Sequence, residues 1–184
     1  MCGSLNATGW IGWNWFQMGH KQHKQSAPES LRVAILTVST TRSLTEDKSG
    51  HWMNRHAQRE GHAVISHQVV PDNQFEISQT VRDIVNNQAA DLLLINGGTG
   101  LSPSDVTIEA VRPMFRKELT AFSALFTQLS FETIDSAAIV SRATAGIVEE
   151  TAVFCLPGSI NACKLACKAL IFPEAGHIAA HVKN

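Results

Sequence analysis

Short continuous apolar runs recur along this chain, and polar turns separate them. Residues 32–39, 62–70 and 90–97 (RVAILTVS, HAVISHQVV and ADLLLING) are rich in aliphatic and β-branched side chains. Runs of this length and composition predict strands, and those over 32–39 and 90–97 fit strands that are buried, as in a parallel sheet. Residues 136–142 (SAAIVSR) and 151–158 (TAVFCLPG) predict two further strands.

Amphipathic segments lie between these runs and predict helices. Residues 75–88 place Ile77, Val81, Ile84 and Val85 on one helical face. A polar loop is predicted over residues 40–50. Further helices are predicted over residues 51–61, from residue 106, over 159–172 and over 173–182, with helix or irregular structure over 116–132. The short polar side chain of Ser104 or Asp105 is expected to cap the helix near residue 106.

The alternation of strands and helices predicts an α/β fold, a three-layer α/β/α domain with a mostly parallel central sheet. The 184 residues suit one domain. We assign residues 26–184 to it and interpret residues 1–25 as an N-terminal extension that is disordered or peripheral. In such sheets, ligands bind at the carboxyl ends of the strands.

Composition narrows the class of partner. The formal net charge is -1, which gives no electrostatic footprint for nucleic acid. No apolar run is long enough to cross a membrane, so no membrane partner is expected. Cys163 and Cys167 fall one helical turn apart, but no second Cys or His pair completes a zinc set, and we interpret them as small apolar residues in a reducing cytoplasm.

The stretch Asn96-Gly97-Gly98-Thr99-Gly100 carries the strongest chemical signal. Glycines at a strand end let several backbone N–H groups point into one concave turn, and such a nest binds anions. The alternative is a tight strand-to-helix connection with no ligand. The stretch lacks the lysine of a phosphate loop, so a metal ion is the expected source of positive charge.

Other polar residues follow the remaining predicted strands. Asp72 and Asp105 would form a two-carboxylate magnesium site beside the glycine turn, since Mg²⁺ prefers hard oxygen ligands. The alternatives are a turn residue at Asp72 and a helix cap at Asp105. Arg142 could clamp a phosphate or form a surface salt bridge. Pro157-Gly158-Ser159 opens a helix whose amides could bind an anion, or is a plain connection.

Seven motifs in their order and spacing resemble one family. They are AILTVSTTR, DKSG, VVPD, NGGTG, DVTIEAVRP, SRATAG and LPGS, and they span the chain from about residue 26 to the C-terminus. The chain resembles the molybdenum cofactor biosynthesis proteins that adenylylate molybdopterin, most closely the bacterial protein B branch.

The resemblance implies transfer of AMP from ATP to molybdopterin with magnesium, giving adenylylated molybdopterin and pyrophosphate. It implies a cytoplasmic homo-oligomer, a trimer or a hexamer. By the family's pattern, Asp72 and Asp105 are the catalytic, metal-associated aspartates. The implied nucleotide-binding residues are Gly97, Gly98, Thr99 and Gly100. The implied substrate-binding residues are Asp47, Ser49, Gly50, Ser141, Arg142, Pro157, Gly158 and Ser159.

The chain departs from this family at a few positions. Ser104 stands where Arg is usual, and Thr40 where Asp is usual. Residues 120–127 (TAFSALFT) lack a Pro, two Gly, a Glu and an Arg that the family carries near its pterin pocket. Ala or Ser in place of Gly disfavours positive φ angles. This segment therefore motivates an alternative, a non-catalytic protein that binds molybdopterin or assists assembly. A third reading is hydrolysis of another nucleotide pyrophosphate.

Apolar side chains in residues 115–131 exceed what one small domain needs. We expect some of Phe115, Phe122, Leu125, Phe126 and Phe131 to lie in a homo-oligomer interface.

Overall fold

The computed structural model describes residues 28–183, and the predicted extension over residues 1–25 lies outside them. Six strands form one sheet in the order β2-β1-β3-β6-β5-β4. The strands are β1 (Arg32–Val38), β2 (Ala63–Val70), β3 (Leu92–Asn96), β4 (Lys117–Glu118), β5 (Thr144–Val148) and β6 (Thr151–Leu156). Strands β2, β1, β3 and β6 are parallel, whereas β5 and β4 run antiparallel at one edge.

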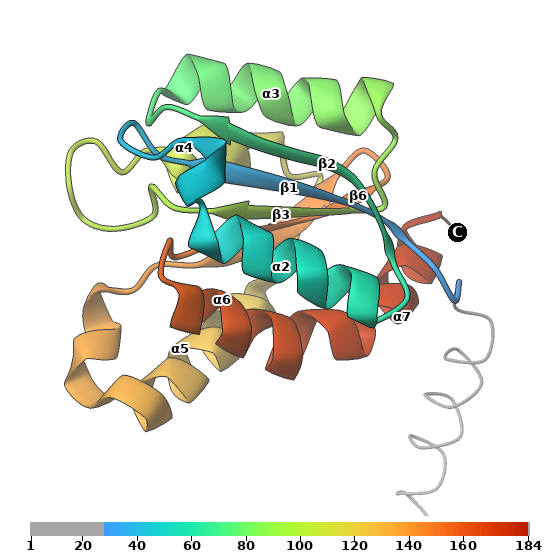
Figure 1. Cartoon of the computed structure of the whole chain (residues 1–184). Coiled ribbons are helices and arrows are strands. Elements are labelled where there is room, and N and C mark those ends of the chain that lie inside the picture. The colour runs from blue at the N-terminus through green and yellow to red at the C-terminus, as the bar shows by residue number, and fades with distance from the viewer. Residues whose placement is uncertain (1–27, 184) are drawn as a thin grey trace, which may run out of the picture.

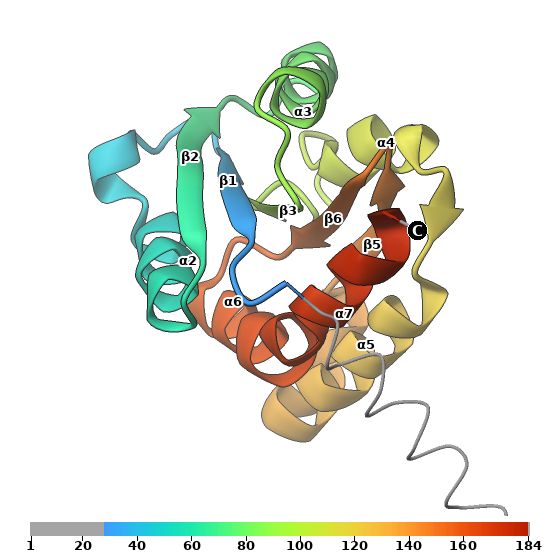
Figure 2. The same ribbon diagram turned by 90° about the vertical axis from the view of Figure 1, so that its right-hand side faces the viewer.

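Helices cover both faces of this sheet (Figures 1 and 2). One face packs against α3 (Gln74–Asn87) and α4 (Thr107–Val111). The other packs against α2 (Lys48–Arg59), α5 (Thr120–Ile134), α6 (Ile160–Ala166) and α7 (Phe172–Lys183). Short 3-10 helices span Leu44–Glu46, Arg112–Met114 and Asp135–Val140, and a π-helical stretch spans Cys167–Ile171. The predicted three-layer α/β/α architecture is confirmed.

The central strands are buried on both faces, as their unbroken apolar runs predict. In β1, Val33 and Ile35 belong to the core beneath α2, while Ala34 and Leu36 belong to the core beneath α3. Burial of one such aliphatic side chain contributes about 1.5–3 kcal/mol. The strand pattern therefore builds two cores and holds the carboxyl ends of four parallel strands at one edge.

The antiparallel edge differs from the prediction. Residues 136–142 were expected to form a strand, but Asp135–Val140 is a 3-10 helix. The strand lies later, at β5, and pairs with β6 in a hairpin. The prediction was wrong because Ile139 and Val140 are apolar without being core residues. Their side chains are exposed, that of Ile139 by 86%.

Two helix starts also differ. Helix α2 begins at Lys48, inside the predicted loop, because the Asp47 carboxylate accepts a hydrogen bond from the Gly50 amide at 2.9 Å and caps the first turn. Helix α4 begins after Val106, and no side chain caps it. The predicted cap by Ser104 or Asp105 was therefore wrong.

Helix α5 contains most of the apolar segment over residues 115–131. Phe122 and Phe126 are buried in the monomer's own core, where Phe122 meets Phe154 edge-on with ring centroids 5.0 Å apart. Leu125 and Phe131 are exposed on the same helix. Phe115 is partly buried against the other core, so three of the five residues named for an oligomer interface pack within the monomer.

The interpretation of Cys163 and Cys167 as apolar residues is confirmed. Both are buried beneath α2, and burial raises the pKa of the Cys163 thiol to about 12. Within residues 28–183, no helix combines the length and apolar character that crossing a membrane requires.

Candidate active site

A cavity of about 420 Å³ lies at the carboxyl edge of the parallel strands. The strand β1 leads to β2 on one side, and the chain then returns to place β3 on the other side of β1. Such a reversal is the usual position of a ligand site in an open α/β sheet. The cavity is lined by Val38, Ser39, Arg42, Asp72, Gly97, Gly98, Thr99, Gly100, Asp105, Ile134, Ala137, Val140, Ser141, Arg142, Pro157 and Gly158.

The glycine turn after β3 has a conformation that requires glycine. Gly97 and Gly98 have φ angles of 94° and 60°. A Cβ on Gly97 would lie 2.2 Å from the Val38 carbonyl oxygen, and one on Gly98 would lie 2.4 Å from Thr107 Oγ1. The Gly97 amide donates to the Leu156 carbonyl at 3.0 Å, which fixes the turn against β6.

The part of this turn that lines the cavity carries unpaired backbone donors. The amides of Gly98, Thr99 and Gly100 donate to no protein acceptor within residues 28–183. The carbonyls on the inner side are held, since Thr107 donates from Oγ1 to Gly97 and from its amide to Gly98. A turn with fixed carbonyls and open amides is an anion nest.

Asp72 and Asp105 lie at the two ends of the turn. The Asp72 carboxylate lies close to Gly98, since a Cβ added to that glycine would be 3.1 Å from Asp72 Oδ1. Its other oxygen accepts hydrogen bonds from the Thr40 amide at 2.7 Å and the Thr40 hydroxyl at 2.8 Å. Asp105 packs against Gly100 and accepts from the Ser102 amide at 2.9 Å. Each carboxylate thus has one oxygen held and another available to a ligand.

This donor set fits magnesium that is shared with a substrate. Within residues 28–183 no group of three or more His, Cys, Asp or Glu side chains is arranged to hold a metal. Magnesium commonly takes only one or two carboxylates and completes its octahedron with water and substrate phosphates. Asp72 and Asp105 are the residues that would hold it, and the adjacent nest would hold the phosphates.

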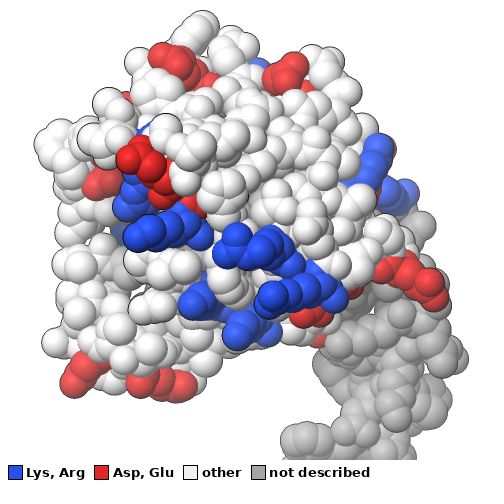
Figure 3. All heavy atoms as spheres, in the orientation of Figure 1, with Lys and Arg blue, Asp and Glu red and all other residues white. Residues whose placement is uncertain are grey.

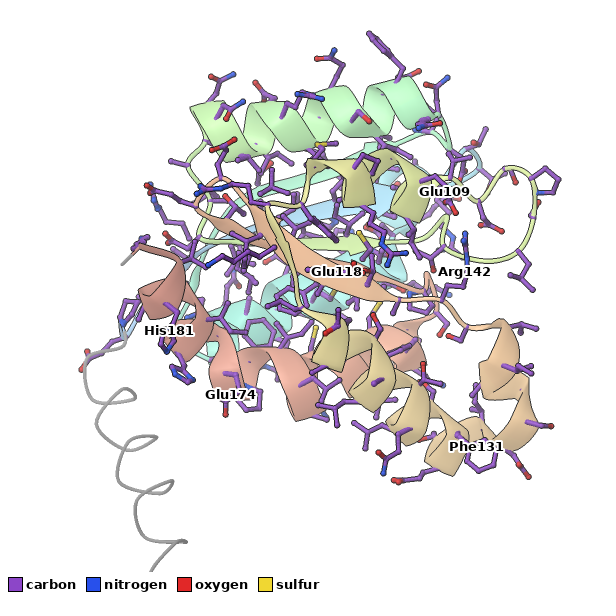
Figure 4. All side chains as sticks on the ribbon, turned by 180° about the vertical axis from the view of Figure 1, so that it is seen from behind. Glu109, Glu118, Phe131, Arg142, Glu174 and His181 are labelled. Atoms are coloured by element: carbon purple, nitrogen blue, oxygen red, sulfur yellow. The ribbon has the colours of Figure 1, made fainter. Side chains whose placement is uncertain are left out.

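The salt bridge that was the alternative prediction for Arg142 is present, and the same guanidinium also holds the glycine turn. Its Nε donates to the carbonyls of Thr99 at 2.9 Å and Gly100 at 3.0 Å. Its two terminal nitrogens contact both carboxylate oxygens of Glu109, at 2.6 and 3.4 Å (Figure 4). Arg142 therefore joins the glycine turn to α4. The hydrogen bond from Arg142 also lowers the pKa of Glu109.

Asp47 lies in a closed polar network. Its side chain is fully buried and accepts from the Thr37 hydroxyl, the Gly50 amide and, at 2.8 Å, His67 Nε2. Burial alone would raise the pKa of Asp47, but the hydrogen bonds from His67, Thr37 and Gly50 outweigh burial and lower it. Thr37 also accepts from the buried Asn96 amide at 2.7 Å. Asp47 and Gly50 line neither cavity described here.

The remaining predicted residues lie around a second cavity of about 620 Å³. Ser49, Gly158 and Ser159 line it together with Thr41, Arg42, Thr45, Glu46, Lys48 and Ile160. Ser49 Oγ donates to the Gly158 carbonyl at 2.9 Å, and Ser159 caps α6. Arg42 and Gly158 line both cavities, so the two cavities are adjacent.

Several residues of the site escaped the sequence prediction. Glu109 falls one helical turn after Asp105, but only the fold shows that it pairs with Arg142, 33 residues away. His67 appeared to be an ordinary strand residue. Ile134, Ala137 and Val140 form an apolar wall of the first cavity. Their apolar character was the available signal, and that of Ala137 and Val140 was attributed to a strand.

The altered segment over residues 120–127 forms the first half of α5 and lines neither cavity. Within residues 28–183, the positive φ angles outside glycine belong to Ala89, Asp135 and Glu149. The segment therefore carries no residue strained by the loss of glycine. The other end of α5 contributes Ile134 to the cavity.

Comparisons with known proteins agree with this geometry. Residues 34–177 match the family described as "Probable molybdopterin binding domain". The chain is 43% identical over 168 residues to "Molybdenum cofactor biosynthesis protein B" of Bacillus subtilis (strain 168), covering 91% of this chain and 99% of that one. It is 35% identical over 163 residues to "Probable molybdopterin adenylyltransferase" of Methanocaldococcus jannaschii, covering 85% and 96%. A crystal structure of "Molybdenum cofactor biosynthesis protein B" superposes with a TM-score of 0.82 at 40% identity, covering 86% and 99%.

Proposed function

The chain belongs to the molybdopterin-binding domain family of molybdenum cofactor biosynthesis proteins, and from that premise we propose that it is a molybdopterin adenylyltransferase. It would transfer AMP from ATP to molybdopterin and release pyrophosphate. One observation carries the proposal. Two carboxylates stand at the two ends of an open anion nest, in a cavity adjacent to a second cavity.

The reaction needs positioning more than acid–base chemistry. An ionised phosphate oxygen of molybdopterin attacks the α-phosphorus of ATP and forms a new P–O bond. The bond from the α-phosphorus to the bridging oxygen breaks, and pyrophosphate leaves with that electron pair. Because the attacking oxygen is already ionised, no side chain has to remove a proton.

The chain's own residues supply the alignment. The amides of Gly98, Thr99 and Gly100 would hold phosphate oxygens of ATP, and Asp72 and Asp105 would hold magnesium. When bound, magnesium neutralises charge on the phosphates and substitutes for the lysine that this glycine turn lacks. The neighbouring cavity, with Arg42 at the boundary, would receive the second substrate. The proposed compartment is the cytoplasm, where ATP is available.

The direct test incubates the purified protein with molybdopterin, ATP and magnesium. We expect adenylylated molybdopterin and pyrophosphate in equal amounts, and no product when magnesium is removed with a chelator. Molybdopterin bound without product would instead support the alternative of a binding or assembly protein. Product formed from a dinucleotide without molybdopterin would support pyrophosphate hydrolysis.

One observation favours the non-catalytic alternative. Thr40 stands where the family usually carries Asp, and it occupies one oxygen of Asp72. Compared with the family's usual pattern, the site has one carboxylate fewer. One oxygen of the Asp72 carboxylate is also already engaged by Thr40. Two carboxylates remain sufficient for magnesium shared with phosphates, which is why we favour the enzyme.

We also propose that the protein is a homo-oligomer, a trimer or a hexamer. Four of the exposed large apolar side chains gather on the end of α5 and the following 3-10 helix, namely Phe131, Ile134, Ile139 and Val140, and Leu125 is exposed earlier on α5. Phe131 projects outward from α5 and is 57% exposed (Figure 4). Contiguous exposed apolar side chains are typical of interfaces. A monomer by light scattering at micromolar concentration would contradict this proposal.

A further inference from the structure

One face of the molecule carries a concentration of positive charge that the net charge of -1 conceals. Basic side chains gather where α2 and α6 lie side by side (Figure 3). Lys48, Trp52, Arg55 and Arg59 recur at helical spacing along the outer side of α2. Lys164 and Lys168 approach from α6 and the π-helical stretch, each with Nζ 5.9 Å from the centroid of the Trp52 ring. We call these residues, with Arg42, the basic face.

The cations of the basic face differ from most others in the protein. Within residues 28–183, Arg32, Arg112, Arg116, Arg142 and Lys183 form ion pairs with Asp or Glu. None of the six cations of the basic face does. The acidic residues at its margin are engaged elsewhere, since Glu46 bonds Ser43 and Glu60 lies 3.8 Å from His56. Like charges gathered without partners raise the energy of the free protein, and an anionic partner would relieve it.

The length of the face argues against a small ligand. Arg42 and Lys48 line the cavities and can contact a bound phosphate. Arg59 follows Lys48 by eleven residues, which places it about 16 Å further along the helix axis. Arg55, Arg59 and Lys168 line neither cavity. These cations therefore fit an extended anion.

The surroundings favour an acidic protein over nucleic acid or a membrane. Lysine ammonium groups lie over the Trp52 ring, which also stacks on His56, so the ring is not available as a platform for a base. The exposed large apolar residues within residues 28–183 lie outside α2 and α6, so nothing on this face would insert among acyl chains.

We propose that the basic face docks an acidic protein surface, placed so that a partner could deliver or receive the anionic pterin at the adjacent cavity. The binding of an acidic surface is inferred only from the unpaired cations of the basic face. The role in delivery rests on the proposed function. Charge pairs across such a contact would mainly raise the rate of association and fix the orientation of the partner.

The test measures binding of a fluorescently labelled oligoglutamate peptide by the full-length protein at low salt. The variant Arg55→Gln/Arg59→Gln/Lys168→Gln should bind at least about tenfold more weakly, because it removes three of the interacting charges. Arg82→Gln/Lys117→Gln is the matched control, since it removes two unpaired cations elsewhere, and it should bind as the wild type does. Equal loss in both variants, or no loss in the triple variant, would overturn the proposal. Thermal unfolding checks that both variants are folded.

Two further measurements separate the competing explanations. Oligothymidylate or phosphatidylserine vesicles that bind the face more tightly than oligoglutamate would reject a protein partner. With free molybdopterin and ATP, the triple variant should keep the wild-type KM for both substrates. A rise in KM that parallels the loss of peptide binding would show that the face attracts small substrates instead. Absence of product from the wild type would refute the proposed function and leave the docking result standing.

Discussion

Two groups of carboxylates lie at the carboxyl edge of the same sheet and differ in their surroundings. Asp47 is buried, and Thr37, Gly50 and His67 surround its oxygens with donors. Asp72 and Asp105 line a cavity, and each has one oxygen held by a neighbouring loop. All three belong to motifs that resemble one family. The environment of each carboxylate, more than its motif, therefore separates the structural role of Asp47 from the catalytic role proposed for Asp72 and Asp105.

The two groups of carboxylates also differ in what they contact. Asp47 fixes the first turn of α2 and, through Thr37 and Asn96, the strand that precedes the glycine turn. Asp72 and Asp105 present charge to the space in front of that turn. Loss of Asp47 should therefore affect stability first, and loss of Asp105 should affect turnover first. Substitutions at these positions test this division between stability and turnover.

The largest effect is expected from Asp105→Asn. The amide oxygen can still accept from Ser102, so the fold is retained, but the charge that would hold magnesium is lost. We expect turnover to fall by about 100-fold or more, equivalent to roughly 3 kcal/mol of transition-state stabilisation. The measurement is the initial rate of pyrophosphate release, together with the midpoint of thermal unfolding.

The matched control for that variant is Asp83→Asn on α3, where the carboxylate accepts only from Asn87 and Gln88 on the surface. It should retain wild-type turnover. If Asp105→Asn is as active as the control, the metal role of Asp105 is wrong.

The second effect is expected from Asp47→Asn. The amide NH₂ would face donors from Thr37 or His67, and at least one buried donor would lose its acceptor. We expect the free energy of unfolding to fall by about 3 kcal/mol, because buried unsatisfied groups are costly. Chemical denaturation measures it. Turnover per folded molecule should fall far less than in Asp105→Asn, and equal losses would abolish the distinction between the two groups.

A third effect concerns the link between the cavity and α4. Arg142→Gln removes the cation that holds the carbonyls of Thr99 and Gly100. We expect kcat/KM for ATP to fall by about tenfold, since hydrogen bonds to charged groups contribute roughly 1.5–3 kcal/mol. Hydrogen exchange at the amides of Gly98 to Gly100 should also accelerate. Glu109→Gln should show a weaker form of both changes, and unchanged exchange in Arg142→Gln would refute the positioning role.

The sequence was sufficient to predict the fold where the local pattern of side chains agrees with their burial. Unbroken apolar runs identified β1, β3 and β6, because buried parallel strands need such side chains on both faces. The edge strand β2 was also identified, although none of its residues is fully buried. The position of the site followed, since the carboxyl ends of parallel strands meet at one edge. Gly97 and Gly98 were recognisable from sequence as turn glycines, because their positive φ angles disfavour other residues and an added Cβ would clash with Val38 or Thr107.

The sequence was insufficient where the decisive contact comes from a distant segment. Strand β5 contains Gly146, which resembles a turn residue. A Cβ there would lie 2.3 Å from the Phe115 ring, so the glycine serves packing within a strand. The burial of Asp47 depends on His67, which approaches from β2. The choice between a phosphate clamp and a salt bridge at Arg142 stayed open, because Glu109 and the turn carbonyls become its neighbours only in the folded chain.

A smaller effect follows from pH. The pKa of Asp47 in the folded protein is lowered, so its carboxylate stabilises the fold fully above the pKa of an unfolded aspartate, about 4. That stabilisation is lost as pH falls through the folded-state pKa. The difference in unfolding free energy between wild type and Asp47→Asn should therefore be constant from about pH 7 to pH 5 and shrink below about pH 4. A difference that does not change on acidification would show that the charge of Asp47 is unimportant.

The smallest effect is expected from Thr40→Val. The hydroxyl bond to Asp72 is lost, but the amide of residue 40 still donates to the same oxygen. One neutral hydrogen bond contributes about 1 kcal/mol, and the remaining bond keeps the carboxylate oriented, so turnover should fall only about threefold. Steady-state kinetics at several magnesium concentrations measure it. A loss as large as that of Asp105→Asn would mean that the hydroxyl itself binds magnesium or substrate. An increase in turnover would mean that Thr40 restrains Asp72 from its ligand, and the substitution of threonine for the usual aspartate would then explain a weakened enzyme.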